Sequence, residues 1–185
     1  MAGNRHSEGD PGRGRISWSW IAAGLFTGLF ALYAAGACRT IYVGDSGELV
    51  AAVHTLGIPH PSGFPLYVLL GKLWTLVLPV GSIAFRMSLF SAACASAACT
   101  VLLAVGRVVG LNRRAAVFGA LLLGFSPSFW SQANIQRVYA LNALSLAVAV
   151  LLAVCWERNR RLPWLAAAFF VCGLSATNHI FMGVA

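Results

Sequence analysis

Residues 84–109, AFRMSLFSAACASAACTVLLAVGRVV, form the longest apolar stretch of the chain, and its only charged residues, Arg86 and Arg107, lie near the two ends. About 20 apolar residues are enough for a helix to cross a hydrocarbon core of about 30 Å, so this stretch can span a bilayer with some tilt. The whole chain is 59% hydrophobic and 10% charged, whereas soluble domains are about 25% charged. Because so few charges cannot cover a water-facing surface, we predict an integral membrane protein with the lipid bilayer as its partner.

Four further apolar runs indicate an all-α, polytopic bundle of about five membrane helices: Trp18–Ala37, Ala115–Phe125, Val138–Trp156 and Leu162 to the end. A sixth apolar segment, Phe64–Pro79, is interrupted by Lys72. At about 15 residues it is short for a span, so an interfacial or re-entrant helix is favoured. Residues 1–17 are polar, Gly-rich and basic, which predicts a disordered tail. Residues 18–185 form the predicted transmembrane domain, with an outward loop at 38–83.

Basic residues are distributed unevenly between the two faces that these spans define. One face carries Arg5, Arg13, Arg15, Arg107, Arg113, Arg114, Arg158, Arg160 and Arg161, and the other carries Arg39, Lys72, Arg86 and Arg137. The positive-inside rule places the first set, and the N-terminus, in the cytoplasm. This orientation requires that Phe64–Pro79 does not cross. The membrane would be the inner or plasma membrane in a bacterium, or the endoplasmic reticulum in a eukaryote.

The net charge of +8 does not indicate nucleic-acid binding, because the basic residues form short clusters between apolar runs. An apolar helix that is still unfinished at Ala185 suggests the N-terminal part of a larger protein, or a fragment.

The outward loop contains the candidate chemistry, beginning with GDSGELV at residues 44–50. The three-to-four spacing of the apolar residues that follow predicts a short amphipathic helix on the membrane, ended by Gly57. Asp45 and Glu48 have the spacing of a capping box, which needs no catalytic role. Alternatively, Asp45 is a general base that takes a proton from an acceptor hydroxyl. The two roles are compatible. Glu48 is either a second carboxylate or, as we favour, only the capping partner.

His60 stands between Pro59 and Pro61, so its backbone is stiff and extended. It is a candidate substrate-loop residue, and a rigid loop corner is an equally good account. The two histidines and two acids of this loop match no metal-site spacing, so no metal site is predicted.

Arginines at the outer ends of membrane helices suggest an anionic ligand. Arg86 and Arg137 each lie at such an end beside apolar residues, where a guanidinium can hold a lipid-linked phosphate. Snorkelling to headgroups is the alternative for both, and for Lys72. Asn178 and His179 lie in the last helix, where polar pairs more often join helices than bind ligand.

Six segments in order resemble one family of membrane proteins, formerly grouped as a domain of unknown function: GDSGEL at 44–49, HPSGFPL at 60–66, FRMSL at 85–89, SPSFWSQ at 126–132, VYALN at 138–142 and TNH at 177–179. The family includes a eukaryotic transmembrane O-mannosyltransferase that acts on plexin-type receptor domains. It is similar to the C-type glycosyltransferases, multi-helix enzymes that use polyprenyl-phosphate sugars. The resemblance implies that Asp45 is the acidic residue of the first extracytoplasmic loop, and that Phe64–Pro79 is interfacial.

The implied function is transfer of a mannose-like sugar from a polyprenyl- or dolichyl-phosphate donor to an acceptor hydroxyl on a protein or glycan. Asp45 would act as base, and Arg86, Arg137 and Lys72 would bind the donor phosphate. The lipid-linked sugar is a co-substrate, and no other cofactor is expected. Family members commonly have Glu where this chain has Arg137. The alternatives are a transporter or flippase-like protein for a lipid-linked or anionic solute, and a non-catalytic membrane subunit.

Overall fold

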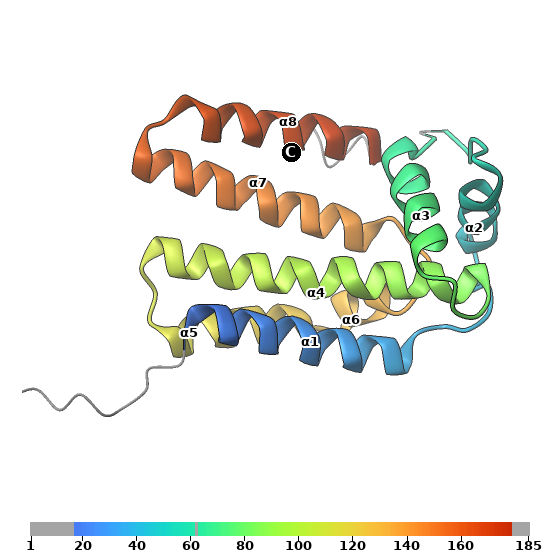
Figure 1. The fold of residues 1–185 in the computed structure, drawn as a ribbon, viewed down its shortest axis with the longest axis horizontal. Coiled ribbons are helices and arrows are strands. Elements are labelled where there is room, and N and C mark those ends of the chain that lie inside the picture. The colour runs from blue at the N-terminus through green and yellow to red at the C-terminus, as the bar shows by residue number, and fades with distance from the viewer. Residues whose placement is uncertain (1–16, 62, 179–185) are drawn as a thin grey trace, which may run out of the picture.

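A computed structural model describes residues 17–61 and 63–178, and its regular secondary structure there is entirely helical. The helices are α1 (Trp18–Gly36), α2 (Ser46–Thr55), α3 (Pro65–Val77), α4 (Ile83–Val109), α5 (Arg113–Gly124), α6 (Pro127–Ala133), α7 (Tyr139–Asn159) and α8 (Leu162–Asn178) (Figure 1). The predicted all-α class is confirmed. Apart from Ser17, the predicted tail lies outside the described residues, as does His179.

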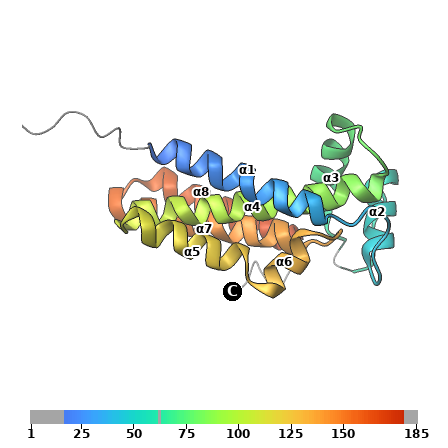
Figure 2. The ribbon, with the colours of Figure 1, turned by 90° about the horizontal axis from the view of Figure 1, so that it is seen from below.

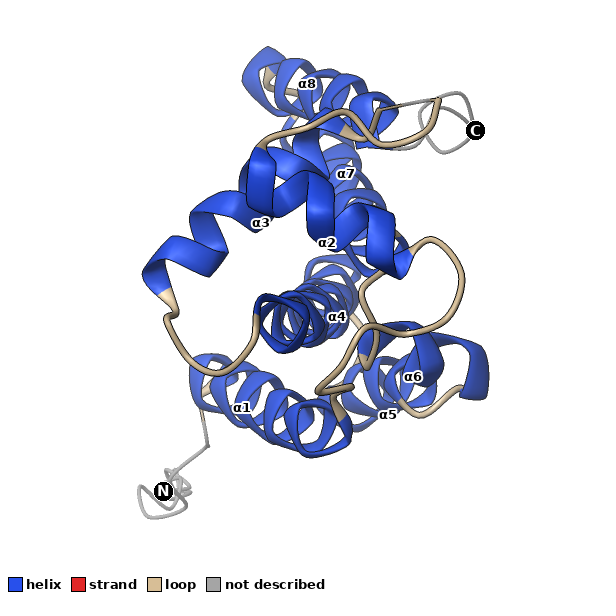
Figure 3. Cartoon of the chain, turned by 90° about the vertical axis from the view of Figure 1, so that its right-hand side faces the viewer, coloured by secondary structure: helices blue, strands red, loops and turns tan. Residues whose placement is uncertain are grey.

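The central helix of the bundle is α4. It packs against α1, α5 and α7, and α7 in turn packs against α8 (Figure 3). Its contact faces carry small, fully buried residues: Ala92, Ala95, Ala98 and Cys99. Near its end, a Cβ added to Gly106 would lie 2.9 Å from the Cβ of Ala116 in α5. Small residues let helix backbones approach closely, which is how membrane helices associate where burial of apolar surface gives no driving force.

Three of the described helices, α1, α4 and α7, are long and apolar enough to cross a membrane. The prediction of about five spans also counted the segments that form α5, with 12 residues, and α8, with 17. Both run alongside the longer helices in Figure 1, but their described parts, which for α8 reach the last described residue, are shorter than the same criterion requires. The predicted span 84–109 differs from α4 by one residue at its start.

The helices α2 and α3 do not run along the bundle but stand across one of its ends (Figure 1). At this end α1 finishes and α4 begins, so the segment between them leaves and re-enters the bundle on one side. We call it the loop end, comprising residues 37–61, 63–82 and 125–138. The opposite end, comprising residues 107–114 and 158–162, is called the basic end. The segment predicted not to cross thus contains α3, which lies across the loop end.

One local prediction was wrong, and another was incomplete. The helix α2 ends at Thr55, and the residue with the left-handed conformation is Leu56 (φ 57°) rather than Gly57. Leu56 takes this conformation because its backbone N–H, like that of Gly57, turns back to the carbonyl of Ala52. The Ser126-Pro127 turn, predicted only as the end of a span, also starts the short helix α6. Proline suits the first turn of a helix because its missing N–H is not needed there.

Candidate functional site

Asp45 and Arg137 form an ion pair at the loop end. Arg137 Nη1 donates to Asp45 Oδ2 at 2.6 Å, and Arg137 Nη2 donates to the carbonyl of Val43 at 3.0 Å. The Arg137 side chain is 18% exposed, whereas that of Asp45 is 54% exposed. The guanidinium therefore fixes one carboxylate oxygen while the rest of the carboxyl group faces outward.

Gly44 makes this arrangement possible. Its φ of +78° is in the left-handed region, which favours glycine. A Cβ at this position would lie 2.5 Å from Arg137 Nη2, so the guanidinium would have to move away to make room for it. The backbone at residue 44 thus lies close against the guanidinium of Arg137. A glycine before Asp45 leaves the space that this contact needs.

The predicted capping box is absent. Asp45 precedes α2, but its own backbone is helical (φ −71°, ψ −4°), and its side chain makes no capping hydrogen bond. An N-cap side chain reaches the first-turn N–H groups from an extended backbone, a geometry that Asp45 does not have. Arg137, distant in sequence, binds the carboxylate instead. Capping is therefore not the role of Asp45 in this structure.

Glu48 pairs with His60 and not with the helix terminus. Its two oxygens lie 2.5 Å from the backbone N and 2.8 Å from Nδ1 of His60. The hydrogen bond from the His60 side chain is the main reason why the pKa of Glu48 is lowered from its ordinary value. The His60 ring also packs edge-on against Phe64, with centroids 5.2 Å apart. The pair ties the start of α2 to the His-Pro segment that precedes α3.

The other predicted phosphate-binding residues, Arg86 and Lys72, make structural hydrogen bonds at the loop end. Arg86 donates to three backbone carbonyls, of Thr75 (3.1 Å), Gly81 (3.0 Å) and Val80 (3.4 Å). It thereby closes the turn between α3 and α4. Lys72 Nζ donates to the carbonyl of His54 at 2.5 Å, near the C-terminus of α2, where a cation is favourable. Arg137, not Arg86, is the arginine paired with Asp45.

A buried polar network, which the sequence analysis missed, holds this loop end together. Gln136 is fully buried, and its Nε2 donates to Ser88 Oγ (2.7 Å) and to the carbonyls of Thr40 (3.0 Å) and Ala84 (3.2 Å). Its Oε1 accepts from the backbone N–H of Tyr42 at 3.1 Å. One amide thus joins the start of α4 to the loop after α1, which places Arg137 opposite Asp45. The only sequence signal was its position beside Arg137.

Comparison with known proteins identifies the family. The family described as the protein O-mannosyl-transferase TMEM260 N-terminal domain matches residues 45–185. The chain belongs to this family. The predicted family is therefore confirmed, and the match contains every candidate residue from Asp45 to Asn178.

Two curated relatives agree with this assignment. The protein O-mannosyl-transferase TMEM260 of Mus musculus is 32% identical over 182 residues, which is 92% of this chain and 25% of the relative. The Dictyostelium discoideum protein of the same name is 26% identical over 171 residues, which is 83% of this chain and 21% of the relative. The chain thus spans about a quarter of the length of these relatives. No solved structure matches.

The last family motif, Thr177-Asn178-His179, lies partly within the described residues. Asn178 is fully buried and donates through Nδ2 to Asn142 Oδ1 and, at 3.2 Å, to the carbonyl of Val138. These contacts join α8 to the start of α7, which is the helix-joining role expected for a polar pair in a membrane. Asn178 thus packs beside the segment that carries Arg137. His179 is outside the described residues.

Proposed function

We propose that this chain carries the N-terminal domain of a protein O-mannosyltransferase that uses a polyprenyl- or dolichyl-phosphate sugar at the extracytoplasmic face. Membership of the TMEM260 family supports this, because the relatives are named as protein O-mannosyl-transferases. The observation that carries the proposal is the Asp45–Arg137 pair: an exposed carboxylate beside a half-buried guanidinium. The carboxylate can take the proton that the acceptor hydroxyl loses during sugar transfer. The guanidinium can balance the negative charge that develops on the departing phosphate.

Asp45 would act as the general base. Oδ2 is held by Arg137, and Oδ1 is not hydrogen-bonded to any of the described residues. Oδ1 would take the proton of the acceptor hydroxyl as that oxygen bonds to the anomeric carbon of the sugar. The bond from this carbon to the phosphate oxygen breaks at the same time, and the lipid phosphate leaves with the bonding electron pair.

Arg137 would stabilise the departing phosphate. A fixed guanidinium placed where negative charge develops lowers the barrier, since it needs no rearrangement during the reaction. Arg86 and Lys72 lie at the same end of the bundle and add positive charge there, although both already donate to backbone carbonyls. Because Arg137 contacts Asp45 and these two residues do not, they would assist the binding of the donor less directly than Arg137.

The distribution of charge supports the proposed face. Arg107, Arg113, Arg114, Arg158, Arg160 and Arg161 all belong to the basic end or to the last turn of the helix that leads to it. The positive-inside rule assigns that end to the cytoplasm, which leaves Asp45 on the extracytoplasmic side. There the helices α2 and α3 would lie at the boundary between water and lipid.

Asp45→Asn in the natural full-length protein tests the proposal. Membranes are supplied with radiolabelled dolichyl-phosphate mannose and an acceptor protein, and the initial rate of transfer is measured. We expect at least about a 100-fold loss, since general bases contribute this much. Glu157→Gln is the matched control, because it removes a carboxylate that pairs with Arg160 at the basic end, and its rate should stay within a few-fold of the natural protein.

Unchanged transfer by Asp45→Asn, at equal abundance in the membrane, would overturn the assignment of the base. Movement of a lipid-linked sugar across sealed vesicles without transfer to protein would instead favour the transporter alternative.

A further inference from the structure

A wedge-shaped groove runs between α1 and α5, towards the basic end. Both helices pack on α4, and Figure 2 views the face on which they lie. Near the loop end they touch: Tyr33 Oη donates to the carbonyl of Gly124 at 2.8 Å, and a Cβ on Gly124 would lie 3.3 Å from Leu29. Towards the basic end they leave a cavity of about 390 Å³, lined by Ile21, Arg113, Arg114, Val117, Phe118 and Leu121.

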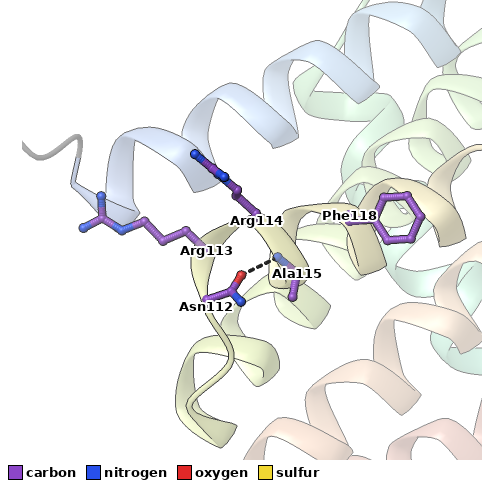
Figure 4. A pocket seen from close by; sticks show the side chains of 5 residues that line it. All are labelled: Asn112, Arg113, Arg114, Ala115 and Phe118. Atoms are coloured by element: carbon purple, nitrogen blue, oxygen red, sulfur yellow. Dashed lines mark hydrogen bonds between the residues drawn. The ribbon is translucent and has the colours of Figure 1, made fainter.

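A second cavity, of about 1030 Å³, adjoins the groove at the start of α5 and shares Arg113, Arg114 and Phe118 with it. Figure 4 shows the two arginine side chains leaving the first turn of α5 in different directions, with the Phe118 ring one turn further along. The Arg113 guanidinium lies 5.6 Å from the centre of the Trp18 ring, which holds it at the mouth of the groove. Arg114 is exposed, and no described residue forms a hydrogen bond or an ion pair with it.

The charge at this place is not neutralised within the described chain. Of the described carboxylates, Asp45 and Glu48 lie at the loop end, and Glu157 pairs with Arg160 at 2.5 Å. The backbone N–H groups of Arg113 and Arg114 add positive potential, because the start of a helix leaves them without intrahelical partners, whereas that of Ala115 donates to Asn112 Oδ1. Two guanidinium groups beside a helix start therefore face an open cavity, and an apolar groove leads away from it.

We propose that this place binds an anionic glycerophospholipid of the bilayer. The phosphate would lie between Arg113 and Arg114, since each guanidinium group can donate two N–H hydrogen bonds to phosphate oxygens. One acyl chain would fill the groove along Val117 and Leu121, where its contacts are apolar. The site is at the opposite end of the bundle from Asp45, so it is independent of the proposed sugar transfer.

Native mass spectrometry of the natural full-length protein, purified in detergent, tests the proposal. The protein is titrated with phosphatidylglycerol and, separately, with phosphatidylcholine. We expect one phosphatidylglycerol to be retained preferentially. In the double variant Arg113→Gln/Arg114→Gln, its affinity should fall about tenfold or more, because two charge-assisted contacts are lost.

Arg160→Gln/Arg161→Gln is the matched control, since it removes two charges from the same end without touching either cavity. It should retain the lipid. Val117→Trp fills the groove without changing the charge and should also lose the lipid. Thermal unfolding of each variant in lipid-free detergent checks that the fold is intact.

Equal losses in the two charge variants would overturn the site, because a general attraction to the basic end would explain both. Retention by Val117→Trp would remove the acyl-chain groove from the proposal. Absence of any retained phosphatidylglycerol in the natural protein would overturn the proposal.

Discussion

Arg137 Nη1 lies 2.6 Å from Asp45 Oδ2, and the two residues are 92 positions apart in the sequence. The pair joins the loop after α1 to the segment before α7, and Arg137 also donates to the carbonyl of Val43. The carboxylate proposed as the base is therefore positioned by a residue that follows α4, α5 and α6 in the chain.

Two substitutions of Arg137 should separate the effect of its positive charge on transfer from the effect of its forked hydrogen bonding. We expect Arg137→Gln to lower the transfer rate at least about tenfold, because it removes both the anchor of Asp45 and the charge facing the phosphate. Arg137→Lys should recover only part of the rate, since an ammonium lacks the fork that donates to two groups at once. Initial rates are compared with those of Arg39→Gln, which removes a cation at the same end that lies over the Phe85 ring. Equal losses in Arg137→Gln and Arg39→Gln would contradict a specific role.

The Glu48–His60 contact should weaken in acid. The pKa of Glu48 is lowered in the folded chain. The contribution of this carboxylate to the stability of the fold is therefore complete above its ordinary pKa of 4.5. It is lost as the pH falls through the lowered pKa of the folded chain. We expect proteolysis around residues 56–61 to accelerate below about pH 4.5. Glu48→Gln should cleave readily at every pH, whereas Glu157→Gln, a control from the basic end, should behave like the natural chain. A pH response that persists in Glu48→Gln would exclude this carboxylate as its source.

The folded protein should be more stable with glycine in place of Leu56. Its φ of 57° is unfavourable for a residue with a Cβ, and its side chain is 54% exposed. We expect Leu56→Gly to raise the free energy of unfolding by about 0.5–1 kcal/mol, after the greater chain entropy of glycine is subtracted. Leu56→Ala keeps the Cβ and should give no gain. Thermal unfolding in detergent measures both variants, and equal behaviour would show that backbone strain is not the cause.

Gln136 should be required for the loop end to hold its shape. Gln136→Leu removes one acceptor and the donor to three groups inside a buried region, and each group left unpaired costs about 1–3 kcal/mol. We expect a clear fall in melting temperature and weaker protection of the Tyr42 amide from hydrogen exchange. Gln132→Leu, in α6, is the control with the same change of side chain, and it should have little effect. A normal exchange rate at Tyr42 in Gln136→Leu would contradict the network.

The two ends of the bundle should lie on opposite sides of the membrane. In a variant without the native cysteines, Ile58→Cys, at a side chain that is 90% exposed, should react with an impermeant maleimide added from the extracytoplasmic side. Leu111→Cys, which is 48% exposed, should react only after permeabilisation. The reverse pattern would place Asp45 in the cytoplasm and remove it from the proposed reaction.

The sequence by itself determined the fold class, the family and the approximate limits of the helices. Hydropathy is a local property, so a run such as 84–109 predicts a membrane helix wherever the rest of the chain lies. The six motifs, from 44–49 to 177–179, are likewise contiguous, and together they were enough to find the family.

Only the tertiary structure decided which side chains meet. The Asp-Glu spacing predicted a capping box, but Arg137 binds Asp45 and His60 binds Glu48. Arg86 resembled a free phosphate ligand, yet it donates to carbonyls of the preceding turn. The physical reason is that a polar group binds whichever partner the packing of the loops brings near, and that packing depends on helices far apart in the chain. Gln136 shows this most directly, since its partners come from two other segments, the loop after α1 and the start of α4, that only the folded bundle brings to it.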